Sequence, residues 1–240
     1  MRKTMFPIAL AICGLANAAE QGNSLDTVVV TGSRISYRDL QDTPAISIIR
    51  KGDYLLQQIT IINDSRSEDS RKQEIYATID RMLAQAGSRY QILSGEEYRI
   101  ALDKSTSHVE LQIDTKRPDV SHVDLYVRVS VDGDASAGDA SIQSLRGFIK
   151  AAAKVGRTEI DMTAETAIGM NKPERYRHDL ISAIAEDSHL VGAELGNDCR
   201  IELTGLNDRI EWQRVSAVEL LLYIPYTMKV TGCSSPPAKS

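Results

Sequence analysis

The sequence has few aromatic residues and no excess of positive charge. Aromatic side chains make up 5% of its 240 residues, and 28 Lys and Arg stand against 33 Asp and Glu, which gives a formal net charge of −5. Proteins that bind nucleic acid usually carry a basic surface, and those that bind single strands also stack bases on aromatic rings. These two deficits therefore argue against a nucleic-acid partner.

Long apolar runs and established catalytic motifs are also missing. After the N-terminal segment the chain contains no run of 18 apolar residues, so we expect no transmembrane helix. It contains no G-x-S-x-G, P-loop, G-x-G-x-x-G, H-E-x-x-H or calcium-loop pattern. We therefore expect no catalytic residues, no bound metal and no cofactor. An enzyme, such as a hydrolase, would need a site assembled from dispersed residues.

The first 18 residues are typical of a secretory signal peptide. Arg2 and Lys3 give a positive start, residues 6–15 form a short apolar core, and Ala18 ends a stretch of small residues before the expected cleavage at Ala18/Ala19. This pattern predicts a protein exported to the periplasm. Lipidation at Cys13 is an alternative, although the preceding Ile12 occupies a position that normally needs a small residue.

Cysteine is scarce, and cleavage of the signal peptide lowers the number of cysteines further. Cleavage removes Cys13 and leaves Cys199 and Cys233, which favour one disulfide in an oxidising compartment. Cys199 opens an expected strand and Cys233 follows the last one, so the two meet if those strands are antiparallel neighbours. Two buried free thiols are the alternative.

Residues 45–230 alternate between strand and helix patterns. Residues 123–131 show the clearest strand, in which apolar and polar side chains alternate. Helices are expected between a capping box at Ser65 and Glu68 and Gly87, over residues 141–154, and from about Pro173 to Gly196. The first and third helices each have an apolar stripe that we expect to be buried: Ile75, Ile79, Met82, Leu83 and Ala86 in the first, and Tyr176, Leu180, Ile184, Val191 and Leu195 in the third. The order predicts an α+β fold of mostly antiparallel sheets, with about three helices packed on one side, in one domain or two subdomains.

The segments around this domain have the composition of linkers. We expect residues 19–44 to be a flexible arm, called the N-terminal arm here, and residues 231–240 to be a disordered tail, because both are rich in Gly, Ser or Pro. Within the domain, Trp212 is expected to be partly buried. The apolar stretch 220–226 is either a core strand or an edge that pairs with a second protomer.

The N-terminal arm contains one apolar run, and the run and its flanking residues resemble a known docking segment. The six residues Asp26, Thr27, Val28, Val29, Val30 and Thr31, followed by Gly32 and residues 33–35, resemble the TonB box of TonB-dependent outer-membrane receptors. The resemblance implies that the arm binds the TonB C-terminal domain, or an outer-membrane receptor, by adding as a strand to a sheet edge. An ordinary strand of the fold and a chance match in a loose arm are the alternatives. A chain of 240 residues with three helices cannot supply the receptor barrel.

The element order of residues 45–230 resembles the SIMPL family of periplasmic and envelope proteins. The similarity consists of an extended N-terminal strand, a helix, several strands, a second helix, a long helix ending at Leu195 and Gly196, and closing strands. It implies an oligomeric envelope stress or assembly protein without established catalysis. The sequence therefore leaves three classes of function: a TonB-docking accessory protein, a SIMPL-like homo-oligomer, and a hydrolase with a dispersed site.

Overall fold

The structure is a computed structural model that describes residues 27–30, 43–95, 99–196 and 198–233. The expected signal peptide, Cys13, Asp26 and Thr31 lie outside the described residues, as do most of the expected arm and residues 234–240 of the expected tail. No helix in these described ranges is long and apolar enough to cross a membrane.

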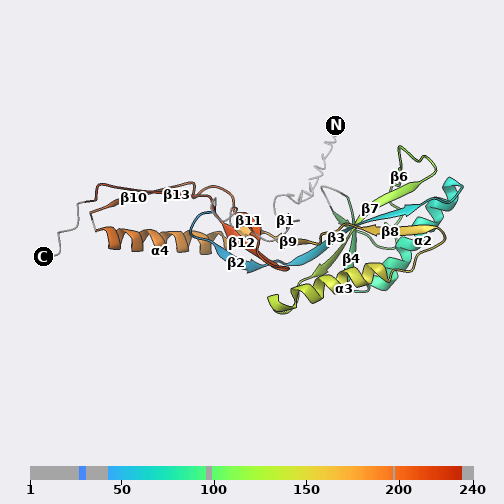
Figure 1. Cartoon of the computed structure of the whole chain (residues 1–240), viewed down its shortest axis with the longest axis horizontal. Coiled ribbons are helices and arrows are strands. Elements are labelled where there is room, and N and C mark those ends of the chain that lie inside the picture. The colour runs from blue at the N-terminus through green and yellow to red at the C-terminus, as the bar shows by residue number, and fades with distance from the viewer. Residues whose placement is uncertain (1–26, 31–42, 96–98, 197, 234–240) are drawn as a thin grey trace, which may run out of the picture.

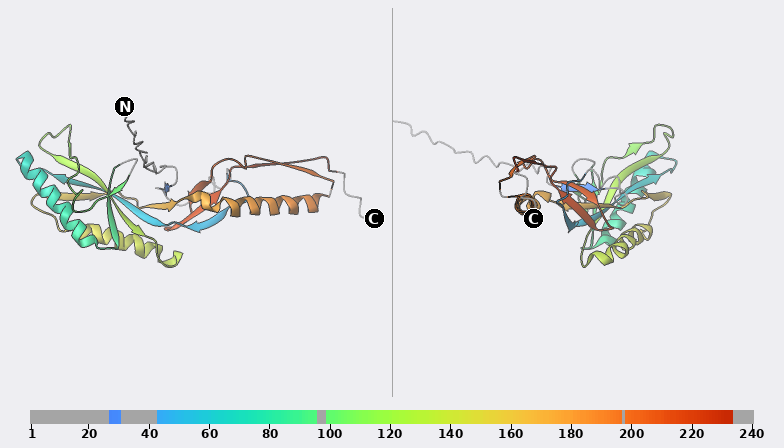
Figure 2. Two further views of the ribbon diagram at one scale, coloured as in Figure 1. Left: turned by 180° about the vertical axis from the view of Figure 1, so that it is seen from behind. Right: turned by 60° about the vertical axis from the view of Figure 1, so that its left-hand side comes forward.

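The described chain is elongated, with a sheet-and-helix body at one end and a slender projection at the other (Figures 1 and 2). From here on, "the arm" means this projection, which contains residues 177–195, 200–204 and 227–231, and not the expected N-terminal arm. The fold is α+β, as predicted, and every strand pair in the described residues is antiparallel. The strands are β1 (Thr27–Val30), β2 (Ile48–Lys51), β3 (Tyr54–Asn63), β4 (Tyr90–Ser94), β5 (Ile100–Ala101), β6 (Gln112–Ile113), β7 (Ser121–Ser130), β8 (Thr158–Met162), β9 (Ala167–Asn171), β10 (Arg200–Thr204), β11 (Glu211–Arg214), β12 (Glu219–Tyr223) and β13 (Thr227–Thr231).

The body is built on a sheet of eight described strands with the path β1-β9-β3-β7-β4-β5, in which β6 also pairs with β7 and β8 with β3. The two ten-residue strands β3 and β7 pair along their whole length. Their alternating side chains send Leu55, Ile59, Ile61, Leu125 and Val127 into one core, which confirms the expected strand over residues 123–131.

Three α-helices are described: α2 (Glu68–Ala86), α3 (Gly138–Lys150) and α4 (Arg177–Leu195). Helices α2 and α3 cover one face of the large sheet, whereas α4 runs along the arm (Figure 2). Two short 3₁₀ turns, η2 (Ala135–Ala137) and η3 (Pro173–Tyr176), precede α3 and α4. The predicted stripe of α2 is confirmed, because Ile75, Ile79 and Met82 are fully buried.

A smaller sheet of order β11-β12-β2 joins the body to the arm. Its middle strand β12 buries Leu220 and Leu222 completely. These residues belong to the same apolar cluster as the body core, so one continuous core reaches the base of the arm. The core-strand interpretation of residues 220–226 is therefore confirmed for β12, although the strand ends at Tyr223, before Pro225.

Three local expectations are wrong. The N-cap of α2 is Ser67, whose hydroxyl accepts the Ser70 N–H, because the Ser65 hydroxyl donates to Glu74 instead. Helix α3 begins three residues earlier than expected and ends at Lys150. Trp212 is 37% exposed because β11 is the edge strand of its sheet.

Candidate functional site: an edge strand and a projecting arm

Four of the six residues of the TonB-box-like segment form strand β1. It pairs antiparallel with β9, with Thr27 opposite Asn171 and Val30 opposite Ile168. Within the described chain β1 pairs with β9 alone, so it is the last strand of the large sheet. Its other side is a strand edge, where backbone N–H and C=O groups can pair with a further strand.

Strand β9, which carries this edge strand, is fixed to the body by buried side chains and by hydrogen bonds. Its Ile168 and Met170 side chains are fully buried in the core. Asp53, at the corner between β2 and β3, holds the strand through its own N–H, which donates to Gly169 O at 2.8 Å, and through its carboxylate, which accepts the Asn171 N–H at 2.6 Å. The same carboxylate pairs with Arg175 at 2.8 Å, which links β9 to the base of the arm.

The arm consists of α4 and the two-stranded ribbon β10-β13 (Figure 1). Helix α4 has 19 residues, a length of about 28 Å. The predicted disulfide is confirmed: Cys199 and Cys233 are bonded, with a Cα–Cα distance of 4.2 Å. Because β10 starts after Cys199 and β13 ends before Cys233, the bond closes the free end of the ribbon.

The base of the arm is tied to the body by polar contacts. Arg177 donates to the backbone carbonyls of Leu206 and Asp208, the latter at 2.8 Å. Arg50 on β2 pairs with Asp179 at 3.2 Å and lies over the Tyr176 ring at 5.3 Å. These contacts fix the first turn of α4, and therefore the direction in which the arm projects.

Burial falls along the arm from base to tip. Leu180 and Ile184, in the first half of α4, are fully buried. Near its end Leu190 is 60% exposed and Leu195 is 48% exposed. The expectation that Leu195 shares one buried side with Leu180 is wrong, because the ribbon is two strands wide and cannot cover that much of the helix. The tip thus presents large apolar side chains to solvent.

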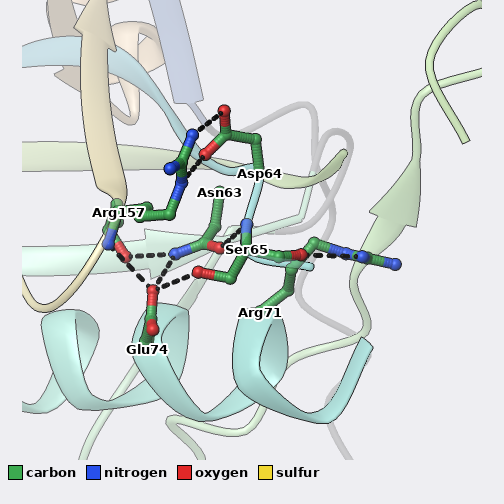
Figure 3. A network of polar contacts seen from close by, with 7 residues as sticks. Asn63, Asp64, Ser65, Arg71, Glu74 and Arg157 are labelled. Atoms are coloured by element: carbon green, nitrogen blue, oxygen red, sulfur yellow. Dashed lines mark hydrogen bonds and ion pairs between the residues drawn. The ribbon is translucent and has the colours of Figure 1, made fainter. Parts of the chain in front are cut away.

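A polar network lies at the opposite end of the body, where α2 meets β3 and β8 (Figure 3). Glu74 Oε2 accepts hydrogen bonds from Asn63 Nδ2 at 2.7 Å, Ser65 Oγ at 2.8 Å and the Arg157 N–H at 2.9 Å. These donors, led by Asn63, hold the pKa of Glu74 below its usual value. The buried Arg71 guanidinium donates to Ser65 O and to Ser121 Oγ.

This network is suited to holding elements together rather than to acid–base catalysis. The Glu74 carboxylate is ionised and engaged by three donors, which makes it a weak base. Asp64 is engaged in the same way, because Arg157 donates to both of its oxygens at 2.6 and 2.8 Å and lowers its pKa. The described residues contain no group of three or more His, Cys, Asp or Glu placed to hold a metal ion.

The chain was compared with family models, curated proteins and solved structures, and nothing in the three sets matches it. The assignment of function therefore depends on the surfaces described above. The disulfide was predicted from the sequence, whereas residues 27–30 were expected in a flexible arm, with an ordinary strand as an alternative, and form β1. Strand β9 and the exposed leucines of the arm were not predicted. The leucines could not be found from periodicity, because a stripe on a helix does not indicate how wide its partner is.

Proposed function

We propose that the protein is an exported, non-enzymatic accessory protein that docks to the C-terminal domain of TonB through Asp26, Thr27, Val28, Val29, Val30 and Thr31. The observation that carries the proposal is the position of β1 at the outer edge of the large sheet. A partner strand can add there while β1 keeps its pairing with β9, so docking requires no rearrangement of the domain.

The physical basis is strand addition, in which main-chain hydrogen bonds supply affinity and alternate side chains supply specificity. Three consecutive valines favour the extended conformation that such pairing needs. The pairing with β9 supports this use, since the segment already forms a strand on a sheet edge. The disulfide at the arm tip is compatible with the oxidising periplasm, where TonB presents its C-terminal domain.

The experiment is a pull-down with purified TonB C-terminal domain. The bait is the mature protein, either intact or with residues 24–34 deleted, and a variant lacking residues 234–240 serves as the deletion control. We expect the 24–34 deletion to keep its circular dichroism spectrum and to lose TonB, while the control retains it. If the deletion unfolds the domain, the segment is required for folding and the proposal fails.

The exposed arm favours a second function, that of a SIMPL-like homo-oligomeric assembly protein. Leu190 and Leu195 lie at the free end of a projecting element, where a second copy can cover them without approaching the body. Obligate interfaces between copies are rich in such apolar side chains.

Sedimentation velocity tests this second function. We expect the intact protein to sediment as an oligomer and the double variant Leu190→Glu/Leu195→Glu as a monomer. Ser182→Glu adds one charge at an exposed position nearer the base of α4 and is the matched control, which should remain oligomeric. An intact protein that is monomeric throughout the concentration range would contradict the oligomeric function.

A further inference from the structure

The face of the large sheet that α2 and α3 leave uncovered carries an apolar floor with two arginines over it. Leu56 on β3, Leu93 on β4 and Ala167 on β9 form this floor together with Tyr54, and all four are more than nine-tenths buried. Tyr126 on β7 packs beside them. This second cluster is separate from the main core and lies on a face of the sheet, not at the β1 edge proposed for docking.

Both arginines are stacked on tyrosine rings. The Arg128 guanidinium carbon lies 3.8 Å from the centre of the Tyr54 ring, and that of Arg99 lies 4.4 Å from the centre of the Tyr126 ring. Burial raises the pKa of Tyr54, and Arg128 and Arg99 partly offset this rise, so both charges lie close to that ring. Arg128 is directly opposite Leu56 in the β3-β7 pairing.

Neither arginine is within ion-pair distance of a carboxylate in the described chain, whereas six other cationic side chains are. A guanidinium stacked on a ring keeps its N–H groups free at its edge, in the planar fork that matches a carboxylate. Stacking also fixes the side chain before a ligand arrives, which reduces the entropy lost on binding.

A cavity of about 470 Å³ opens beside Arg99, which is the arginine in its lining. Leu56, Ala167 and Tyr126 supply its apolar surface, and Arg99, Gln58 and Glu165 supply polar groups. Its volume is within the range of small-molecule sites, which runs from about 300 to 1,000 Å³.

One wall of the cavity is a loop held by a buried side chain. The loop between β8 and β9 is not part of the strand pairing with β3, which leaves a gap in the β3 pairing between Leu56 and Ile59. The fully buried Gln57 lies in this gap and bonds to the loop. Its amide donates to Thr163 O at 2.9 Å and to Thr163 Oγ1 at 2.8 Å, and its carbonyl oxygen accepts the Thr166 hydroxyl at 2.6 Å. The cavity wall is therefore preorganised.

We propose that this cavity binds an amphipathic monocarboxylate, with the apolar body against the partly exposed Tyr126, beside Leu56 and Ala167, and the carboxylate on the edge of Arg99. The Arg99 guanidinium, which has no ion-pair partner among the described residues, selects a negative charge. Glu165 on the rim repels a second one, so a singly charged carboxylate fits better than a doubly charged phosphate ester.

The test is a ligand-observed NMR titration of the mature protein with three eight-carbon probes: octanoate, octyl phosphate and octylammonium. We expect octanoate to bind more tightly than octyl phosphate and octylammonium not to bind. Arg99→Gln should weaken octanoate binding about tenfold, a loss typical of a hydrogen bond to a charged group. Because Arg99 is exposed, this variant should keep the wild-type melting temperature.

Arg89→Gln is the matched control. Arg89 is also exposed and also lies over a tyrosine, at 5.3 Å from the centre of the Tyr90 ring, but it is not part of the cavity wall. It should leave octanoate binding unchanged. Absence of octanoate binding, equal binding of octylammonium, tighter binding of octyl phosphate, or unchanged binding in Arg99→Gln would each overturn the proposal.

Discussion

At the scale of single residues, the Glu74 side chain occupies the space that a side chain at Gly156 would need. Gly156 has a φ of +57°, and a Cβ placed on it would lie 2.1 Å from the Glu74 side-chain carbon Cδ. The next residue, Arg157, donates its N–H to the same carboxylate. A glycine is therefore required here both for its backbone conformation and for the space that the carboxylate occupies.

Substitution of two glycines separates these two requirements. Gly87 has a φ of +56° and no atom within 4 Å of an added Cβ, so Gly87→Ala changes the backbone preference alone. We expect it to cost about 1 kcal/mol, and Gly156→Ala to cost at least about 1 kcal/mol more, because Glu74 must move and lose donors. Urea denaturation of both variants measures this difference, and equal losses would contradict the contact.

The lowered pKa of Glu74 predicts a pH dependence of stability. A carboxyl group whose pKa is lower in the folded state stabilises the protein above its unfolded pKa, and this contribution is lost as the pH falls through the folded value. Glu74→Gln should therefore melt below the wild type at pH 7. The gap should close as the pH falls below about 4.3, the unperturbed pKa of Glu. A gap of constant size between pH 7 and pH 3 would show that the charge of Glu74 is not what stabilises the network.

At the scale of elements, the arm depends on the bond between Cys199 and Cys233. The bond closes a sequence separation of 34 residues, for which the chain-entropy model gives about 3–4 kcal/mol. The ribbon β10-β13 has exposed side chains at alternate positions and packs on the single helix α4, so it has few other contacts that stabilise it.

The double variant Cys199→Ser/Cys233→Ser should loosen the arm and spare the body. We expect amide hydrogen exchange to rise in β10, β13 and the last turns of α4, with protection of β3 and β7 unchanged. Hydrogen exchange followed by mass spectrometry gives this residue-range resolution. A uniform loss of protection over the whole chain would mean that the arm and the body unfold as one unit.

Strand β9 shows why part of the candidate site could not be predicted from sequence. Gly169 lies in the middle of this strand, and glycine is depleted in strands. The residue is required because the Tyr54 ring lies 2.2 Å from where its Cβ would be, and Tyr54 is more than a hundred residues away in sequence. In contrast, the alternation in β7, the stripe of α2 and the disulfide depend on local patterns or on cysteine count, and all three were predictable.

At the scale of the whole molecule, the edge proposed for docking and the cavity proposed for ligand binding are different parts of the body. Strand β1 extends the sheet sideways from β9, whereas the cavity beside Arg99 lies on a face of the same sheet. The arm extends away from both and leaves them accessible (Figure 2). A partner docked at the edge, as proposed, would therefore leave the face and the arm accessible.

Calorimetric titration with the purified TonB C-terminal domain tests most directly whether the TonB-box-like segment docks by strand addition, as we propose. Val29→Pro removes one backbone donor and fixes φ in β1, whereas Val29→Thr keeps a β-branched side chain and the donor. We expect Val29→Thr to bind like the wild type and Val29→Pro to bind at least about tenfold more weakly, a difference of about 1.4 kcal/mol. Equal affinity of the wild type and Val29→Pro would contradict strand addition at β1.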